Sequence, residues 1–148
     1  MPGSSDYLTL LQSEFLPLIE GQYRVDSSQR TIVGASFGGL LVTHAFLDSA
    51  SSGLFKNFIA TDASYGYMAQ EYALLQDTAL ADVSEYDVNL YLYGATAGGN
   101  DYFVDLYHQQ LQALEIDGLN ISYVHEQVRH TEAGLPAFEV ALDLMFGE

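Results

Sequence analysis

Short apolar runs alternate with longer amphipathic stretches along the whole chain, and no other property of the sequence restricts the fold as much. Four of these runs, rich in β-branched, aromatic and aliphatic residues, have the length of buried strands: residues 29–35, 55–61, 88–94 and 120–126. Most connections between them are long enough for a crossover, which indicates parallel strands joined right-handedly. The pattern therefore predicts an α/β class fold with three layers, α/β/α, and a parallel sheet of about four strands.

Helices are expected between and beside these strands. Apolar residues recur at helical spacing in residues 7–23, 37–49, 101–114 and 133–146. Pro17 lies inside the first pattern and is expected to kink that helix or end its first part. Residues 64–86 lack a clear period and are expected to form a loop with one helical stretch. No internal repeat divides the chain, so residues 1–148 are expected to form a single domain with a sizeable core.

The charge balance excludes several kinds of partner. The 148 residues include 20 Asp and Glu against 4 Lys and Arg, for a formal net charge of −16. A nucleic acid requires clustered cations to neutralise its phosphates, and an anionic membrane surface requires them too, so neither partner is expected. No apolar run reaches the roughly 20 residues that a membrane-spanning helix needs. The simplest interpretation is a solvated acidic surface.

The absence of cysteine narrows the chemistry further. With no cysteine in the chain, a disulfide framework, a thiolate metal site and a cysteine nucleophile are all excluded. The first six residues have neither the basic region nor the apolar stretch of a signal peptide. Because the natural protein can begin upstream of Met1, the compartment is left open.

Residues 34–38 read Gly-Ala-Ser-Phe-Gly, a G-x-S-x-G motif, and Gly39 follows. The motif ends an expected strand and opens an expected helix, which is the setting of a nucleophile elbow. A serine in such a turn stands clear of the sheet at a helix N-terminus, whose dipole favours developing negative charge. Ser36 is therefore the predicted nucleophile, and the backbone N–H of Phe37 is the predicted oxyanion donor. The alternative is an ordinary glycine-rich turn.

A serine nucleophile needs a general base, and the chain has four histidines. His44 lies inside the helix after the motif, too far round to reach Ser36, and His108 lies mid-helix, where a surface position is expected. His130 lies in the loop after the last strand, from which a base reaches the carboxyl edge of the sheet. His130 is the predicted base, and His125, at the end of the last strand, is the fallback.

Two segments resemble a known family. One runs through residues 7–23 and 30–40, with Leu-Pro-Leu-Ile-Glu at 16–20 and the G-x-S-x-G motif; the other covers residues 130–146. Together they resemble the putative esterase family, an α/β-hydrolase group that includes S-formylglutathione hydrolases, feruloyl esterases and siderophore esterases. The second segment is most similar to the histidine loop and last helix of the siderophore-esterase branch. The resemblance spans nearly the whole chain and implies hydrolysis of an ester.

The resemblance also implies an acid that orients the histidine. The family usually has it just beyond the strand that precedes the penultimate helix, which here ends at residues 91–94. At the usual spacing this sequence has Ala97, so the pattern is broken. Asp101 is the nearest carboxylate and is the predicted acid, with Asp105 one helical turn further. Asp101 serving only as a helix cap, and a serine–histidine dyad without an acid, remain open alternatives.

A further departure concerns the elbow strand. The family has about four strands before the elbow, and a loop there supplies the second oxyanion donor. Here one expected helix precedes the elbow strand, so the chain is expected to be the C-terminal half of an α/β-hydrolase fold, N-terminally incomplete, or a minimal relative. Losing one donor costs about 10²–10³ in rate, so weak activity of this chain alone is expected. An exposed edge at residues 31–35 would favour a homodimer.

Together these features predict a serine hydrolase that cleaves small-molecule carboxylic esters through an acyl-enzyme. The predicted catalytic residues are Ser36, His130 and Asp101, and Phe37 is the predicted oxyanion donor. No metal and no organic cofactor is expected. The alternative function is a non-catalytic domain that keeps the hydrolase shape and acts as a binding or structural module.

Overall fold

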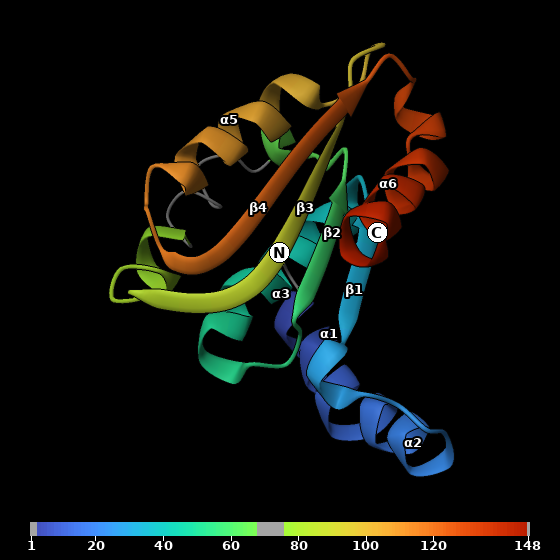
Figure 1. The fold of residues 1–148 in the computed structure, drawn as a ribbon, viewed down its shortest axis with the longest axis vertical. Helices are drawn as coiled ribbons and strands as arrows, with labels where there is room; N and C mark the ends of the chain where they lie inside the picture. The colour runs from blue at the N-terminus through green and yellow to red at the C-terminus, as the bar shows by residue number, and fades with distance from the viewer. Residues whose placement is uncertain (1–2, 68–75, 148) are drawn as a thin grey trace.

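Four parallel strands form the centre of the molecule (Figure 1). The structure, a computed structural model, describes residues 3–67 and 76–147. The strands β1 (Thr31–Ala35), β2 (Asn57–Thr61), β3 (Glu85–Ala95) and β4 (Asp117–Glu126) lie side by side in chain order, and each pairs in parallel with the next. The predicted α/β class and the predicted parallel sheet are confirmed.

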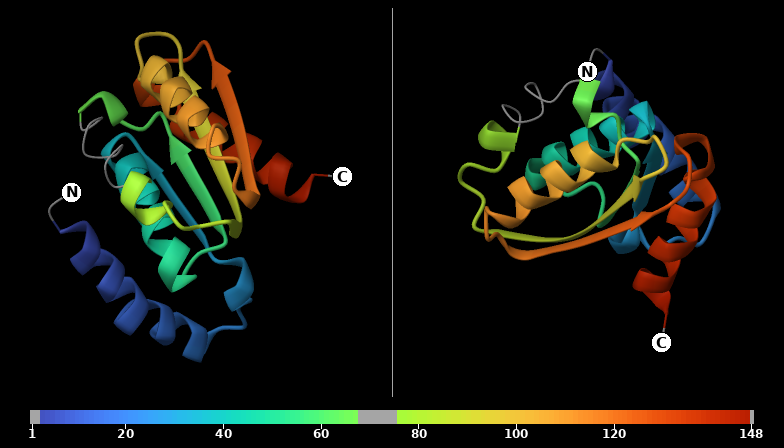
Figure 2. Two further views of the ribbon diagram at one scale, coloured as in Figure 1. Left: turned by 90° about the vertical axis from the view of Figure 1, so that its left-hand side faces the viewer. Right: turned by 90° about the horizontal axis from the view of Figure 1, so that it is seen from above.

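Helices cover both faces of this sheet (Figure 2). The helices α3 (Phe37–Ser52) and α5 (Asp101–Gln112) pack on one face, and α6 (Gly134–Phe146) packs on the other. α3 lies against β1 and β2, α5 lies against β3 and β4, and α6 lies against β2. Because β2 is covered on both faces, all five of its residues are buried, as is typical of a central parallel strand.

The N-terminal segment is helical but not a uniform α-helix. Its α-helical parts, α1 (Ser4–Leu10) and α2 (Leu16–Gln22), are joined by the π-helical turn η1 (Leu11–Phe15). Pro17 lacks an N–H, and its ring would clash with the carbonyl four residues earlier in a regular α-helix. A π turn widens the helix at this point and accommodates the ring. The kink or break predicted at Pro17 therefore takes the form of a π turn.

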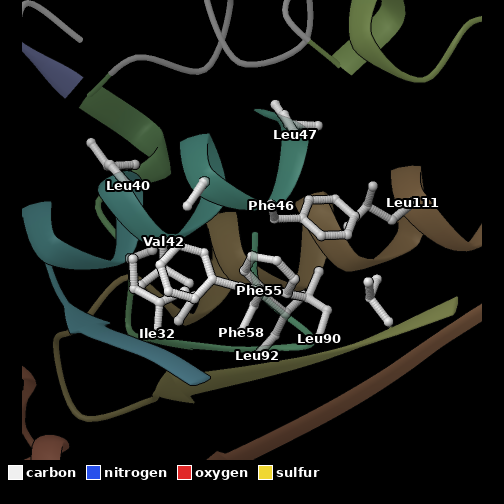
Figure 3. Close-up of a cluster of buried hydrophobic side chains, with 14 of the residues drawn as sticks. Ile32, Leu40, Val42, Phe46, Leu47, Phe55, Phe58, Leu90, Leu92 and Leu111 are labelled. Atoms are coloured by element: carbon white, nitrogen blue, oxygen red, sulfur yellow. The ribbon is translucent and has the colours of Figure 1, made fainter. Parts of the chain in front are cut away.

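The main core lies between the sheet and the helices α3 and α5 (Figure 3). Phe46 of α3 packs edge-to-face on Phe58 of β2, with ring centroids 5.6 Å apart, and both side chains are fully buried. Leu40 of α3 and Leu90 of β3 are also fully buried. Burying each such side chain contributes about 1.5–3 kcal/mol. This packing holds α3 on β1 and β2, and so it positions the turn between β1 and α3.

The observed elements extend some of the expected ones. β3 and β4 begin with polar residues that the apolar runs do not include, because Glu85 pairs with Asp117 before a bulge that ends at Val88. Of the expected loop over residues 64–86, η3 (Tyr65–Tyr67) is a 3-10 turn and residues 76–79 are helical. Residues 68–75 lie outside the described part of the chain. Within the described part, no helix has the length and apolar character needed to cross a membrane.

Candidate active site

Ser36 lies in a tight turn between a strand and a helix. β1 ends at Ala35, α3 begins at Phe37, and Ser36 between them has φ 56° and ψ −117°. Residues other than glycine rarely adopt a positive φ, and such strain is held only where the surrounding structure enforces it. This is the strand–turn–helix geometry that the motif predicts.

Gly34 of the motif and Gly39, which follows the motif, are both required by close packing. A Cβ at Gly34 would lie 2.3 Å from the carbonyl oxygen of Gly38, and a Cβ at Gly39 would lie 2.6 Å from the Cβ of Ala63. The first contact closes the turn between β1 and α3. The second brings α3 against the segment that follows β2. The glycines therefore shape both the turn at Ser36 and its packing against the neighbouring strand end.

His130 opens a short 3-10 turn, η4 (His130–Glu132), after the last strand. The side chains of Arg129 and Glu132 pair across this turn, and Glu132 also accepts a hydrogen bond from the N–H of Arg129 at 3.2 Å. Ala133, fully buried, anchors the end of the turn. Nε2 of His130 lies 3.0 Å from Oγ of Ser36. The structure thus brings the predicted nucleophile and the predicted base into hydrogen-bond contact.

Asp62, and not Asp101, lies against this histidine. A carboxylate oxygen of Asp62 forms a short hydrogen bond with Nδ1 of His130. Asp101 instead accepts a hydrogen bond from the hydroxyl of Tyr123 at 2.5 Å, because it lies in the first turn of α5, which packs toward β4. Asp105 accepts a hydrogen bond within its own helix. The prediction that Asp101 orients the base is therefore corrected to Asp62.

The end of β3 and the loop that follows it hold Asp62 in place. The N–H groups of Ala95 and Asn100 each donate to Oδ1 of Asp62 at 2.9 Å, and the side-chain amide of Asn100 donates to the Asp62 carbonyl at 2.9 Å. Asp62 is 1% exposed. Backbone donors in fixed positions orient a buried carboxylate firmly. Residues 95–100 are where the family resemblance implies an acid; in this chain they supply N–H donors to an acid from the neighbouring strand.

The pairing of β1 with β2 explains why Asp62 lies beside Ser36, which the sequence motif alone does not indicate. Ser36 is the first residue after β1 and Asp62 is the first residue after β2, and the last residues of these strands, Ala35 and Thr61, are partners in the sheet. Ligands and reacting groups gather at the carboxyl ends of parallel strands, where neighbouring strand ends meet. A carboxylate directly after the strand expected at residues 55–61 was therefore the available clue.

The hydrogen bonds define which ring nitrogen carries the proton. A carboxylate accepts, so Nδ1 of His130 donates to Asp62. In the neutral ring Nε2 is then the acceptor, and the hydroxyl of Ser36 donates to it. This is the arrangement that a general base needs to remove the proton of a serine.

The other three histidines lie elsewhere. Nε2 of His44 is 3.3 Å from the hydroxyl of Ser5. The ring of His108 lies 5.0 Å from that of Tyr123, so it is half-buried rather than a simple surface residue, and burial lowers its pKa. His125, the fallback base, has a 60% exposed side chain, with Nδ1 3.2 Å from the hydroxyl of Tyr123. In the described part of the chain, no hydrogen bond joins these rings to Ser36.

Phe37 is the first residue of α3, directly after Ser36. The first N–H groups of a helix have no partner inside the helix, and the helix dipole adds partial positive charge there. Phe37 is 53% exposed, and its ring meets the ring of Tyr67 edge-on, with centroids 5.3 Å apart. The Phe37 N–H therefore lies at the end of the helix where an oxyanion donor is expected, and the side chain of Phe37 is exposed beside it.

A cavity of about 440 Å³ lies at the opposite, amino edge of the sheet. Its lining includes Lys56 and Asp87, whose charged groups pair at 2.5 Å. Its lining contains none of the residues that contact Ser36. The candidate site is therefore located by the hydrogen bonds among Ser36, His130 and Asp62 and not by the size of a cavity. Among residues 3–67 and 76–147, no group of three or more His, Cys, Asp or Glu is placed to hold a metal ion.

The fold and the elbow define the class of this chain, an α/β-hydrolase fold with a serine at the strand-to-helix turn. The family model described as "Putative esterase" matches residues 1–65, which include the elbow and Asp62. The resemblance to this family that the sequence predicts is thereby confirmed. No curated protein matches the sequence.

Several solved structures, among them two hydrolases, share the fold. An IroE-like serine hydrolase from Shewanella oneidensis superposes with a TM-score of 0.83 at 23% identity, over 97% of this chain and 48% of that chain. The BES protein from Bacillus cereus superposes with a TM-score of 0.81 at 16% identity, over 99% of this chain and 56% of that chain. The siderophore hydrolase EstA from Aspergillus nidulans superposes with a TM-score of 0.78 at 18% identity, over 97% of this chain and 56% of that chain. The chain spans about half the length of these structures.

Proposed function

We propose that this chain carries the catalytic residues of a serine esterase that cleaves carboxylic esters through an acyl-enzyme on Ser36. The observation that carries the proposal is the continuous hydrogen-bonded path from Ser36 through His130 to Asp62. An elbow serine, a correctly oriented imidazole and a buried carboxylate are the three parts that acyl transfer needs. The family match over the elbow and the hydrolase fold support the same reaction.

In the first half-reaction, Oγ of Ser36 adds to the ester carbonyl carbon while its proton passes to Nε2 of His130. The π electrons of the carbonyl move to its oxygen, and the Phe37 N–H at the start of α3 donates to that oxyanion. When the tetrahedral intermediate collapses, the bond to the alkoxy group breaks and the leaving alcohol takes the proton from Nε2. Asp62 holds the Nδ1 proton and stabilises the imidazolium while it exists.

The second half-reaction repeats these steps with water. Water adds to the acyl carbon and gives a proton to Nε2 of His130, and the second tetrahedral intermediate expels Ser36, which recovers that proton. The free carboxylic acid leaves. No atom of the protein is consumed, and the same three side chains serve both halves.

The net charge and the exposed aromatic residues near Ser36 narrow the range of substrates. With a net charge of −16, the chain repels anionic esters, so a neutral small-molecule ester is the favoured substrate class. The exposed rings of Phe37 and Tyr67 beside the elbow favour an apolar acyl group. Two structural neighbours are a siderophore hydrolase and an enterobactin hydrolase, so ester-linked siderophores belong in the set of substrates to be assayed.

Covalent labelling tests the proposal directly. The purified chain is treated with a fluorophosphonate, and the adduct is located by peptide mass spectrometry. The expected result is one adduct on the peptide that contains Ser36, with none in Ser36→Ala. A Ser36 that stays unlabelled in a folded chain would contradict the esterase proposal and favour the non-catalytic module.

A further inference from the structure

We infer that Ser64 is a further catalytic residue, whose hydroxyl donates a hydrogen bond to Oγ of Ser36 and directs the Ser36 proton to His130. The inference rests on the proposed function of Ser36 as a nucleophile. It deepens that proposal, because it gives the nucleophile a second polar contact besides its base.

Two contacts join Ser64 to the nucleophile. Its Oγ lies 3.1 Å from Oγ of Ser36, and its backbone N–H donates to the carbonyl oxygen of Ser36 at 3.2 Å. The backbone bond fixes the main chain of one residue against that of the other. The half-buried hydroxyl therefore approaches the reacting oxygen from a defined direction.

The segment around Ser64 is anchored on both sides. Ala63 is fully buried against Gly39 at the start of α3, and Asp62 is 1% exposed. On the other side, Tyr65 is 3% exposed and its hydroxyl lies 2.7 Å from that of Thr43. A single stretch after β2 thus contacts His130 through Asp62 and contacts Ser36 through Ser64.

The donor and acceptor capacity of the two hydroxyl groups shows which of them donates in the Ser36–Ser64 hydrogen bond. A serine hydroxyl has one proton and two lone pairs. The imidazole nitrogen of His130 is a more basic acceptor than the hydroxyl of Ser64, so the Ser36 proton points to Nε2. Ser64 is then the donor to a lone pair of Oγ of Ser36.

This donation acts on the first step of the reaction. It disfavours rotamers in which the Ser36 proton points to water, so more of the protein is ready for proton transfer to His130. It also stabilises the negative charge that develops on Oγ of Ser36 as the proton leaves. No bond to Ser64 forms or breaks, and its proton stays on its own oxygen.

The test measures the second-order rate of fluorophosphonate labelling of the full chain between pH 5 and 9. Ser64→Ala and Ser64→Cys remove or weaken the donor, Ser64→Thr keeps it, and Ser84→Ala is the matched control. Ser84 is exposed and precedes β3 at the opposite edge of the sheet. A neutral hydrogen bond is worth about 1 kcal/mol, so we expect about a fivefold loss for Ala and Cys. Ser64→Thr should stay within about threefold of the wild type, and Ser84→Ala should match it.

The pH profile separates a catalytic role from a structural one. Because His130 remains the base, the loss in Ser64→Ala should be the same across the pH range, with thermal unfolding unchanged.

If Ala and Cys variants react at the wild-type rate while Ser36 is labelled, the inference is overturned and the esterase proposal stands. Equal losses in Ala, Cys and Thr variants would also overturn it, because they indicate packing. A wild-type chain that is never labelled would overturn both the esterase proposal and the inference about Ser64. If Ser64→Ala does not fold, the Cys and Thr variants make the same comparison.

Discussion

Two aspartate–histidine pairs lie at the carboxyl edge of the sheet, and they differ in burial. In the pair next to Ser36, the side chain of Asp62 is 1% exposed and that of His130 is 34% exposed. In the pair beside β4, the side chain of Asp101 is 24% exposed and that of His125 is 60% exposed, with their closest atoms 3.6 Å apart. The first pair is held by backbone donors from the end of β3 and the loop that follows it, and the second is more exposed to solvent.

Tyr123 makes the second pair a different kind of site. Its hydroxyl donates to Asp101 at 2.5 Å and lies 3.2 Å from Nδ1 of His125. Burial, followed by Asp101, raises the pKa of Tyr123, so this hydroxyl keeps its proton. The stronger partner of Asp101 is therefore a phenol rather than an imidazole. An aspartate and a histidine form a general base only where the carboxylate is fixed and a nucleophile lies at the other ring nitrogen.

The largest expected difference is between the two histidines. His130→Ala removes the group that accepts the Ser36 proton, and we expect the rate of Ser36 labelling to fall by about 10⁴-fold or more. His125→Ala should change it less than about twofold. Comparable losses in both variants, measured with unchanged circular dichroism, would assign a catalytic role to the exposed pair as well.

The two aspartates should differ next. Asp62→Asn keeps the shape of the side chain but favours the wrong tautomer of His130, and a fall of about 10³-fold is expected. Asp101→Asn and Asp105→Asn should each leave the labelling rate within about twofold of the wild type. Small and equal effects at all three positions would instead support the serine–histidine dyad that the sequence left open.

What the sequence predicts well follows from local patterns. Apolar periodicity places the four strands and most helices, since buried faces impose it directly on the residues. The motif predicts the tight turn at Ser36, and the order of the chain predicts that His130, after the last strand, reaches it; the structure has both features. The identity of the acid depends on tertiary structure, because the N–H groups that hold Asp62 belong to Ala95 at the end of β3 and to Asn100 in the following loop, 33 and 38 residues away. The spacing of residues along the chain does not predict such long-range hydrogen bonds.

The edge of the sheet nearer to Ser36 is expected to affect assembly. In the described part of the chain β1 pairs only with β2, and Val33 on β1 is 48% exposed. An exposed apolar edge strand favours pairing with another chain, so we propose a homodimer through β1. Light scattering should show about twice the monomer mass, and Val33→Lys should raise the dimer dissociation constant about tenfold. Val25→Lys, exposed but outside the sheet, is the control. A monomeric wild type would contradict this proposal.

The smallest expected effect concerns His108, which packs on Tyr123 beside the exposed pair. Burial lowers the pKa of His108, and Asp105 opposes that shift only in part. The unfolded chain, with a histidine pKa near 6.5, therefore binds this proton more readily than the folded one. The stability that results is present above about pH 6.5 and is lost as the pH falls through the lower, folded-state pKa. Urea unfolding between pH 7.5 and 5 should show a shallower decline of the free energy of unfolding in His108→Gln than in the wild type. His125→Gln, which replaces an exposed ring, should leave the slope nearly unchanged. Parallel curves for wild type and His108→Gln would mean that the ring of His108 is solvated in the folded protein.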